Sequence, residues 1–97
     1  MIIDTVETWI EEHREELGAR GVQLSAFRGA ADRTPSCIVV DFESPDHSGH
    51  LVVWSDGQAQ LNAASYDTNE ILLDEYRRNI DDLGLENAVS TIVDLFG

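Results

Sequence analysis

The sequence contains no lysine, a single cysteine, two prolines and no long hydrophobic run. Because Cys37 is alone, an internal disulfide is excluded, and nothing requires an oxidising compartment. The longest apolar runs, residues 37–40 and 51–54, hold about four residues each, whereas a membrane-spanning helix needs about 20. The first residues carry acids where a secretory signal peptide carries basic residues. We therefore expect a cytoplasmic protein that does not cross a membrane.

The absence of lysine leaves six arginines against nineteen acidic residues, which gives a formal net charge of −13. Most of this charge lies in residues 1–20 and 67–97. Such a field repels nucleic acid and anionic membranes and attracts basic partners. We predict a basic protein partner, and neither a nucleic-acid nor a membrane partner. Solubility and a salt-adapted composition are alternative reasons for the same acidity, and the sequence leaves them open.

Recognisable catalytic motifs are also missing, since there is no Gly-rich phosphate loop, nucleophile elbow or zinc motif. Asp46, His47 and His50 are the one candidate ligand cluster, but a metal site needs three or four converging ligands. Cys37 opens an apolar strand, where a thiol usually acts as a small hydrophobic residue. We predict that the protein is not an enzyme and holds no cofactor or metal. A small metal-dependent hydrolase that uses the 46–50 cluster is the alternative.

Both ends of the chain are predicted to be helical. Apolar side chains recur every three or four residues in residues 2–18, and Gly18 and Gly21 bracket the end of that helix. A closing helix follows a cap at Asp81 or Asp82 and carries an apolar stripe from residue 85 to residue 96. In the first helix we expect Trp9 to pack in the core. We expect His13 at the core edge, with its ring packed and one nitrogen hydrogen-bonded.

Between the helices the pattern changes to that of strands. Residues 37–43 form the clearest strand, with Ile38, Val40 and Phe42 inward. Residues 22–28 read as a short strand, residues 29–36 as a loop, and residues 44–49 as a turn. Residues 71–78 fit either a fifth strand or a helix that begins near residue 68. The strand is favoured because the four-residue turn before it suits an antiparallel meander.

Residues 49–66 are predicted to form a hairpin around a two-residue turn at Asp56-Gly57. In that register Trp54 faces Ala59, Val52 faces Leu61, and His50 faces Ala63. Since a slip of one residue exchanges the two faces of a strand, the turn determines which side chains enter the core. The expected core face of the hairpin, on which Trp54 packs inward, consists of Val52, Trp54, Ala59, Leu61 and Ala63.

These elements predict one α+β domain that covers residues 1–97. It has an N-terminal helix, an antiparallel meander of four or five strands and a C-terminal helix. Both helices are expected on one face of the sheet, with the other face open to solvent.

The acidic surface is the feature that departs most from an ordinary small domain. Acids form a nearly continuous face on the first helix, gather where the strand 37–43 ends, and recur in the strand 71–78. Carboxylates accept hydrogen bonds and ion pairs from Arg and Lys. We therefore predict a partner-binding surface composed of Glu11, Glu12, Glu15, Asp41, Glu43, Asp74 and Glu75.

Residues 51–96 combine the corner Trp54-Ser55-Asp56-Gly57, a following strand, the turn Asp67-Thr68-Asn69-Glu70, an apolar and acidic strand, and a final apolar helix. This combination covers about half of the chain. It resembles the small immunity proteins of bacterial polymorphic-toxin and contact-dependent-inhibition systems, and the TriTu-like family in particular. The resemblance implies a non-enzymatic immunity protein that neutralises a cognate toxin domain by stoichiometric binding.

An alternative function is a generic interaction module, such as a secretion chaperone, that captures a peptide or partner on the open sheet face. The sequence leaves open whether the protein is a monomer or a homodimer.

Overall fold

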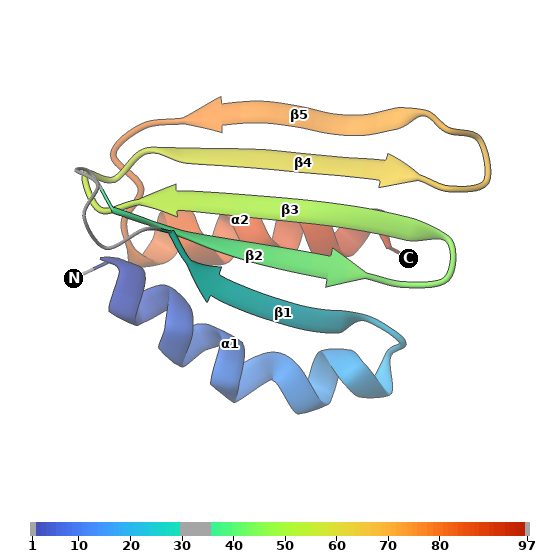
Figure 1. Cartoon of the computed structure of the whole chain (residues 1–97), viewed down its shortest axis with the longest axis horizontal. Helices are drawn as coiled ribbons and strands as arrows, with labels where there is room; N and C mark the ends of the chain where they lie inside the picture. Colours follow the sequence, from blue (N-terminus) through green and yellow to red (C-terminus); the bar gives the residue numbers. More distant parts are fainter. Residues whose placement is uncertain (1, 30–35, 97) are drawn as a thin grey trace.

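The computed structural model describes residues 2–29 and 36–96 and shows one sheet with two helices on the same side (Figure 1). This arrangement confirms the predicted α+β class and the helix–meander–helix order. The predicted loop at residues 29–36 lies for the most part outside the described residues. In chain order the elements are α1 (Ile2–Ala19), β1 (Gln23–Arg28), β2 (Cys37–Glu43), β3 (His47–Trp54), β4 (Ala59–Ser65), β5 (Ile71–Arg77) and α2 (Asp82–Leu95).

The sheet has the order β1-β2-β3-β4-β5, so each strand pairs antiparallel with its neighbours in the sequence. The stretch from residue 71 is strand β5, as predicted. The turn predicted at residues 44–49 is wrong in its length, because β3 already begins at His47. Ser48 and Gly49 have the composition of a turn, yet they pair with Glu43 and Phe42 and continue the ladder.

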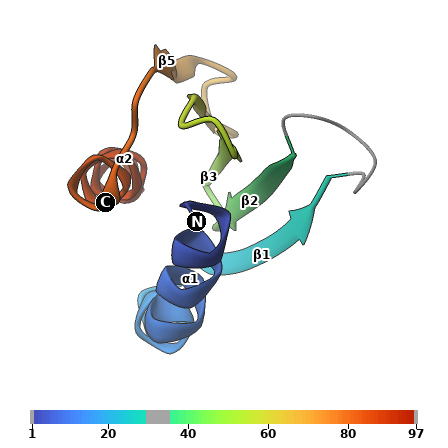
Figure 2. The same ribbon diagram turned by 90° about the vertical axis from the view of Figure 1, so that its left-hand side faces the viewer.

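Helix α1 buries its apolar stripe and lies beside β1 and β2 (Figure 2). The helix ends at Ala19, and the N–H of Val22 donates to the carbonyl oxygen of Leu17 at 2.9 Å. Gly21 supports this C-terminal turn with a φ of 86°, a conformation that costs glycine little. The buried side chains are Ile3, Val6, Ile10 and Leu17.

Helix α2 packs against β4, and its Ile92 and Phe96 also lie close to Gly49 of β3. Its N-cap is Asp81, whose carboxylate accepts a hydrogen bond from the N–H of Gly84 at 2.7 Å. Gly49 of β3 permits close packing, because a Cβ there would lie 2.9 Å from Cγ2 of Ile92 and 3.3 Å from Cε1 of Phe96. The absence of a side chain at residue 49 therefore determines how near α2 comes to the strand.

The core lies between this covered face of the sheet and the two helices. Ile38, Val40 and Phe42 point inward, as predicted, and Phe42 is fully buried. Its ring meets that of Phe96 edge to face at 6.5 Å between centroids. The other strand residues in the core are Leu24, Leu51, Val53, Ala59, Leu61 and Ala63.

The predicted register of the β3–β4 hairpin is wrong by one residue. Val53, and not Trp54, pairs with Ala59, and Leu51 pairs with Leu61. The N–H of Trp54 donates to the carbonyl of Gln58, while the N–H of Gly57 donates to the carbonyl of Trp54. The loop therefore holds three residues, 55–57, and Gly57 adopts a φ of 92°. An Asp-Gly pair suits both loops, and the three-residue form with a bulged glycine is adopted here.

This shift exchanges the two faces of β3 but leaves β4 unchanged. The inward positions Ala59, Leu61 and Ala63 are confirmed. On β3, however, Leu51 and Val53 are buried, and Val52 and Trp54 lie half-buried on the opposite face. The expectation that Trp54 packs in the core is therefore wrong.

Candidate partner-binding surface

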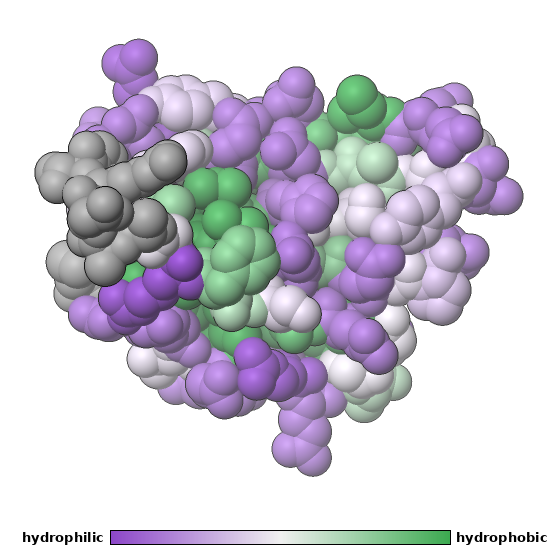
Figure 3. Space-filling view, in the orientation of Figure 1, coloured by the Kyte–Doolittle hydropathy of each residue, from purple (hydrophilic) through white to green (hydrophobic). Residues whose placement is uncertain are grey.

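The face of the sheet opposite the helices is open, and it divides into bands that cross the strands. Figure 3 looks onto this face. Hydrophobic side chains gather over the ends of β1, β2 and β3 nearest the turn at residues 55–57, and a band of hydrophilic side chains lies beside them. Because side chains alternate between the faces of a strand, the register determines which residues share a band.

The first band is apolar and aromatic. Its central line follows cross-strand pairs from Phe27 to Val39, to Val52, to Gln60 and to Tyr76. The pair formed by Cys37 and Trp54 extends the band by one position. Phe27 is 55% exposed and Tyr76 is 46% exposed. We name this band the apolar patch, with the members Phe27, Cys37, Val39, Val52, Trp54 and Tyr76.

The second band carries acidic and polar groups. It follows the pairs from Ser25 to Asp41, to His50, to Asn62 and to Asp74, and we name it the acidic row. Nδ1 of His50 lies 2.5 Å from Oδ1 of Asp41. Nε2 of Gln60 donates to Oδ1 of Asp74 at 2.9 Å. Neighbouring amide and imidazole groups therefore hold both carboxylates in place on the open face.

A third band lies at the end of the sheet away from the apolar patch. It includes Glu43, which pairs with Ser48 across the strands. The hydroxyl of Tyr66 donates to Oε1 of Glu43 at 2.6 Å. This hydrogen bond to a carboxylate raises the pKa of the Tyr66 hydroxyl above its ordinary value, because it stabilises the protonated phenol.

A hollow of about 240 Å³ lies where the acidic row meets β5. Its lining includes the carboxylate of Asp74, the ring of His50 and the apolar side chains of Ala64, Ile71 and Leu73. Small-molecule sites usually measure about 300–1,000 Å³. The hollow is smaller than these sites and combines an apolar wall with a carboxylate.

The acids predicted to bind a partner occupy three separate places. Asp41, Glu43 and Asp74 share the open face. Glu75 does not, because it follows Asp74 in the strand and points to the helix side, where Nε and Nη2 of Arg77 bind its carboxylate. The acids Glu11, Glu12 and Glu15 are exposed on α1, which packs on the opposite side of the sheet.

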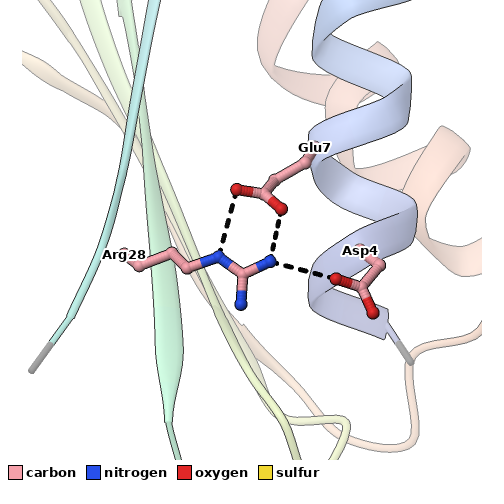
Figure 4. Close-up of polar contacts among 3 residues, drawn as sticks. All are labelled: Asp4, Glu7 and Arg28. Atoms are coloured by element: carbon pink, nitrogen blue, oxygen red, sulfur yellow. Dashed lines mark hydrogen bonds and ion pairs between the residues drawn. The ribbon is translucent and has the colours of Figure 1, made fainter. Parts of the chain in front are cut away.

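Three of the arginines whose side chains are described bind carboxylates on the helix side of the sheet. Arg28 of β1 donates to Glu7 of α1 through Nε and Nη2, and the same Nη2 also donates to Asp4 (Figure 4). The hydrogen bonds from Arg28 lower the pKa of Glu7, and these two carboxylates raise the pKa of Arg28. Arg14 pairs with Glu11, and Arg77 pairs with Glu75. Arg78 follows the edge strand β5, and its Cζ atom lies 5.8 Å from the ring centroid of Tyr76 on the open face.

The candidate metal ligands diverge. The ring of His47 packs against Phe96 on the helix side, with 5.5 Å between centroids, whereas His50 pairs with Asp41 on the open face. In the part of the chain that the structure describes, no three acidic, histidine or cysteine side chains are grouped so as to hold a metal ion. The arrangement gives no support to a hydrolase centred on residues 46–50.

The histidine and tryptophan of α1 behave as predicted. The rings of Trp9 and His13 stack with centroids 4.2 Å apart, and Nδ1 of His13 lies 2.8 Å from the carbonyl oxygen of Trp9. Trp9 packs against the core cluster. The pair lies at the edge of the core on the helix side and belongs to none of the three bands of the open face.

The apolar patch is the feature that sequence reasoning missed. The sequence does contain a signal for this patch, because residues 37–40 and 51–54 are apolar without interruption. A strand with one solvated face alternates between apolar and polar residues. An uninterrupted apolar run therefore places apolar side chains on both faces, including the one that the helices leave open.

The Immunity protein TriTu family matches residues 4–94, which include every helix and strand described above except the ends of the two helices. The chain belongs to the TriTu immunity protein family. Membership in this family indicates toxin neutralisation and a cognate toxin as the partner, and the family is not one of enzymes. Comparison with curated proteins and with solved structures yields no match. Within residues 2–29 and 36–96, no helix is both long enough and apolar enough to traverse a bilayer.

Proposed function

We propose that this TriTu family member neutralises its cognate toxin domain by stoichiometric binding in the cytoplasm, and that its acidic surface meets a basic partner. The observation that carries the proposal is the family match over residues 4–94. The net charge of −13 supports a basic partner, because opposite charges at an interface accelerate the encounter of two proteins and favour one partner over others.

Two acidic regions are available for such contact. One consists of the exposed Glu11, Glu12 and Glu15 on α1, and the other of Asp41, Glu43 and Asp74 on the open face of the sheet. The guanidinium groups of Arg14, Arg28 and Arg77 are bound to carboxylates on the helix side. The open face therefore keeps carboxylates with few cations beside them among the described residues.

Inhibition by binding requires no chemistry from this chain. A folded domain that covers the active site of a toxin, or holds it in an inactive shape, blocks turnover for as long as the complex lasts. The lifetime of the complex and its one-to-one ratio are therefore the quantities that decide whether the proposal holds.

The test is a calorimetric titration against the C-terminal domain of the protein encoded immediately upstream, at low and at physiological salt. We expect a one-to-one complex of nanomolar affinity that weakens as salt rises, because salt screens the attraction between charges. Absence of heat and of a complex at both salt concentrations would contradict the proposal.

Two sets of charge reversals then separate the acidic regions. One variant carries Glu11→Arg and Glu15→Arg on α1, and the other carries Asp41→Arg and Asp74→Arg on the open face. Each replaces two carboxylates with two guanidinium groups, so the net charge of the two variants is equal. A difference in affinity between them therefore reports the location of the charge and not its amount.

A further inference from the structure

Resting on the proposed function, we infer that the toxin domain docks on the open face of the sheet, where the apolar patch holds it and the acidic row orients it. The complementary surface of the toxin is an apolar protrusion bordered by Arg and Lys side chains.

The apolar patch has the composition of the centre of an interface. Aromatic residues are enriched in such centres and carry much of the binding energy when a partner excludes water from them. Phe27 and Tyr76 are about half exposed at the two ends of the line that runs through Val39 and Val52. The hydroxyl of Tyr76 is already engaged with Oε1 of Gln58, so its ring is held in place before a partner arrives.

The acidic row supplies the charged border. Asp41 and Asp74 lie at either side of His50 and Asn62, two residues along their strands from the apolar patch. The hollow beside Asp74 suits one long basic side chain, since the aliphatic stem of Arg or Lys packs on apolar atoms while its charged end meets a carboxylate. A cation seated there would point at Asp74 past Ile71.

The dimensions of the face favour a domain over a peptide. Five strands spaced about 4.8 Å apart, each about seven residues long with a rise of about 3.3 Å, present a face of roughly 24 by 23 Å. A standard protein–protein interface buries about 800 Å² on each partner. The projected area of this face, about 550 Å², is roughly two-thirds of that value, whereas one extended peptide would cover only a strip of it.

The charges argue against a second copy of this chain as the occupant. If two copies met through their open faces, each would bring its own acidic row and a net charge of −13. Like charges placed opposite each other across an interface cost several kcal/mol and suppress such pairings. A partner with basic residues around an apolar centre would instead place apolar atoms on the apolar patch and cations beside the acidic row.

The test measures the association and dissociation rates of the inactivated upstream-encoded toxin domain on the full-length protein. In the apolar patch, Phe27→Ser and Val52→Thr each remove apolar contact, and Val52→Thr preserves the shape and the strand preference of the residue. The matched control is Leu83→Ser, which removes a side chain that is 77% exposed on α2. In the acidic row, Asp41→Asn with Asp74→Asn is compared with Glu86→Gln with Asp94→Asn, which neutralises two exposed carboxylates on α2.

We expect Phe27→Ser to accelerate dissociation about tenfold or more while the association rate changes little, because short-range contacts act mainly on dissociation. The Asp41→Asn and Asp74→Asn pair should slow association at low salt and flatten its salt dependence. Leu83→Ser and the α2 pair should leave both rates near those of the unaltered protein. Thermal unfolding of each variant shows that it is folded.

Several outcomes overturn the inference. If the unaltered protein binds but the open-face variants keep its rates, the toxin docks elsewhere, and the proposed function stands without this inference. If the unaltered protein does not bind, the proposed function fails and the inference fails with it. A homodimer that Val52→Thr weakens would assign the face to a second copy, and binding of short peptides in place of the toxin domain would assign it to a chaperone-like role.

Discussion

The two faces of the sheet follow the same alternation of side chains and yet have different chemistry. The centre of the covered face is apolar, with Phe42 and Leu61 fully buried beneath the helices. The ion pair of Arg77 with Glu75 lies on the edge strand β5. The open face changes from apolar to acidic over two residues along each strand, from Val39 and Val52 to Asp41 and His50. An apolar face suits permanent burial beneath the helices. A face with adjacent apolar and acidic bands suits reversible binding of a partner from solution. The following predictions test whether this division of roles holds.

The largest effect is expected on the covered face. Phe42→Ala should lower the free energy of unfolding by about 3–5 kcal/mol, because it removes a fully buried ring and leaves a cavity. The comparison variant is Phe27→Ala on the open face, which should cost about 1 kcal/mol or less, since this ring is already half exposed. Urea denaturation measures both. Equal losses would contradict the view that the two faces have separate roles.

An intermediate effect is expected where α2 meets β3. Gly49→Ala should lower the free energy of unfolding by about 1–3 kcal/mol, because the added Cβ would collide with Ile92. Gly18→Ala is the matched control, since no atom lies within 4 Å of a Cβ built there. As Gly18 lies inside α1, alanine should stabilise the helix by about 0.5–1 kcal/mol. Chemical denaturation of the two variants should therefore give shifts of opposite sign.

The smallest effect is expected at the exposed contact between α1 and β1. Because Arg28 lowers the pKa of Glu7 in the folded protein, this contact stabilises the fold above the ordinary Glu pKa of 4.5 and loses its effect as the pH falls through the lowered value. Arg28→Gln should therefore reduce the Tm slightly at pH 7, and the difference from the unaltered protein should shrink below pH 4.5.

The variant Glu7→Gln provides the control for that pH series, because it removes the titrating carboxylate and keeps a side chain of similar size. Its Tm should no longer respond to the state of residue 7 as the pH falls. A difference between Arg28→Gln and the unaltered protein that stays constant from pH 7 to pH 3 would contradict the assignment.

Local patterns in the sequence predict every helix and strand but not the relation between two neighbouring strands. The stripes of α1 and α2 and the alternation in residues 37–43 are local signals, and the structure confirms them. The register of the β3–β4 hairpin depends on whether Asp56 and Gly57 form a two-residue turn or end a three-residue loop. The same dipeptide suits both turns, so packing of Leu51 and Val53 against the helices decides between them.

This one-residue difference also limits what could be predicted of the site. Charge and expected exposure select Asp41, Glu43 and Asp74 as binding candidates, but their common face follows only from the pairing of four strands. Adjacency in the sequence groups Glu75 with Asp74, whereas the alternation of β5 places them on opposite faces. The predicted two-residue turn places Val52 and Trp54 in the core, whereas both lie on the open face.

The strand order of the sheet affects how soon after its synthesis the protein is folded. Each strand pairs with one that precedes or follows it directly in the chain, so most ladder contacts join residues that are close in sequence. Pairing between consecutive strands favours faster folding than pairing between distant ones, and even β-rich domains fold within about milliseconds to seconds. Synthesis of the chain takes about 5–20 s at about 5–20 residues per second. The chain can therefore reach its folded form almost as soon as α2 leaves the ribosome, which gives a newly made inhibitor little delay before it can meet its toxin.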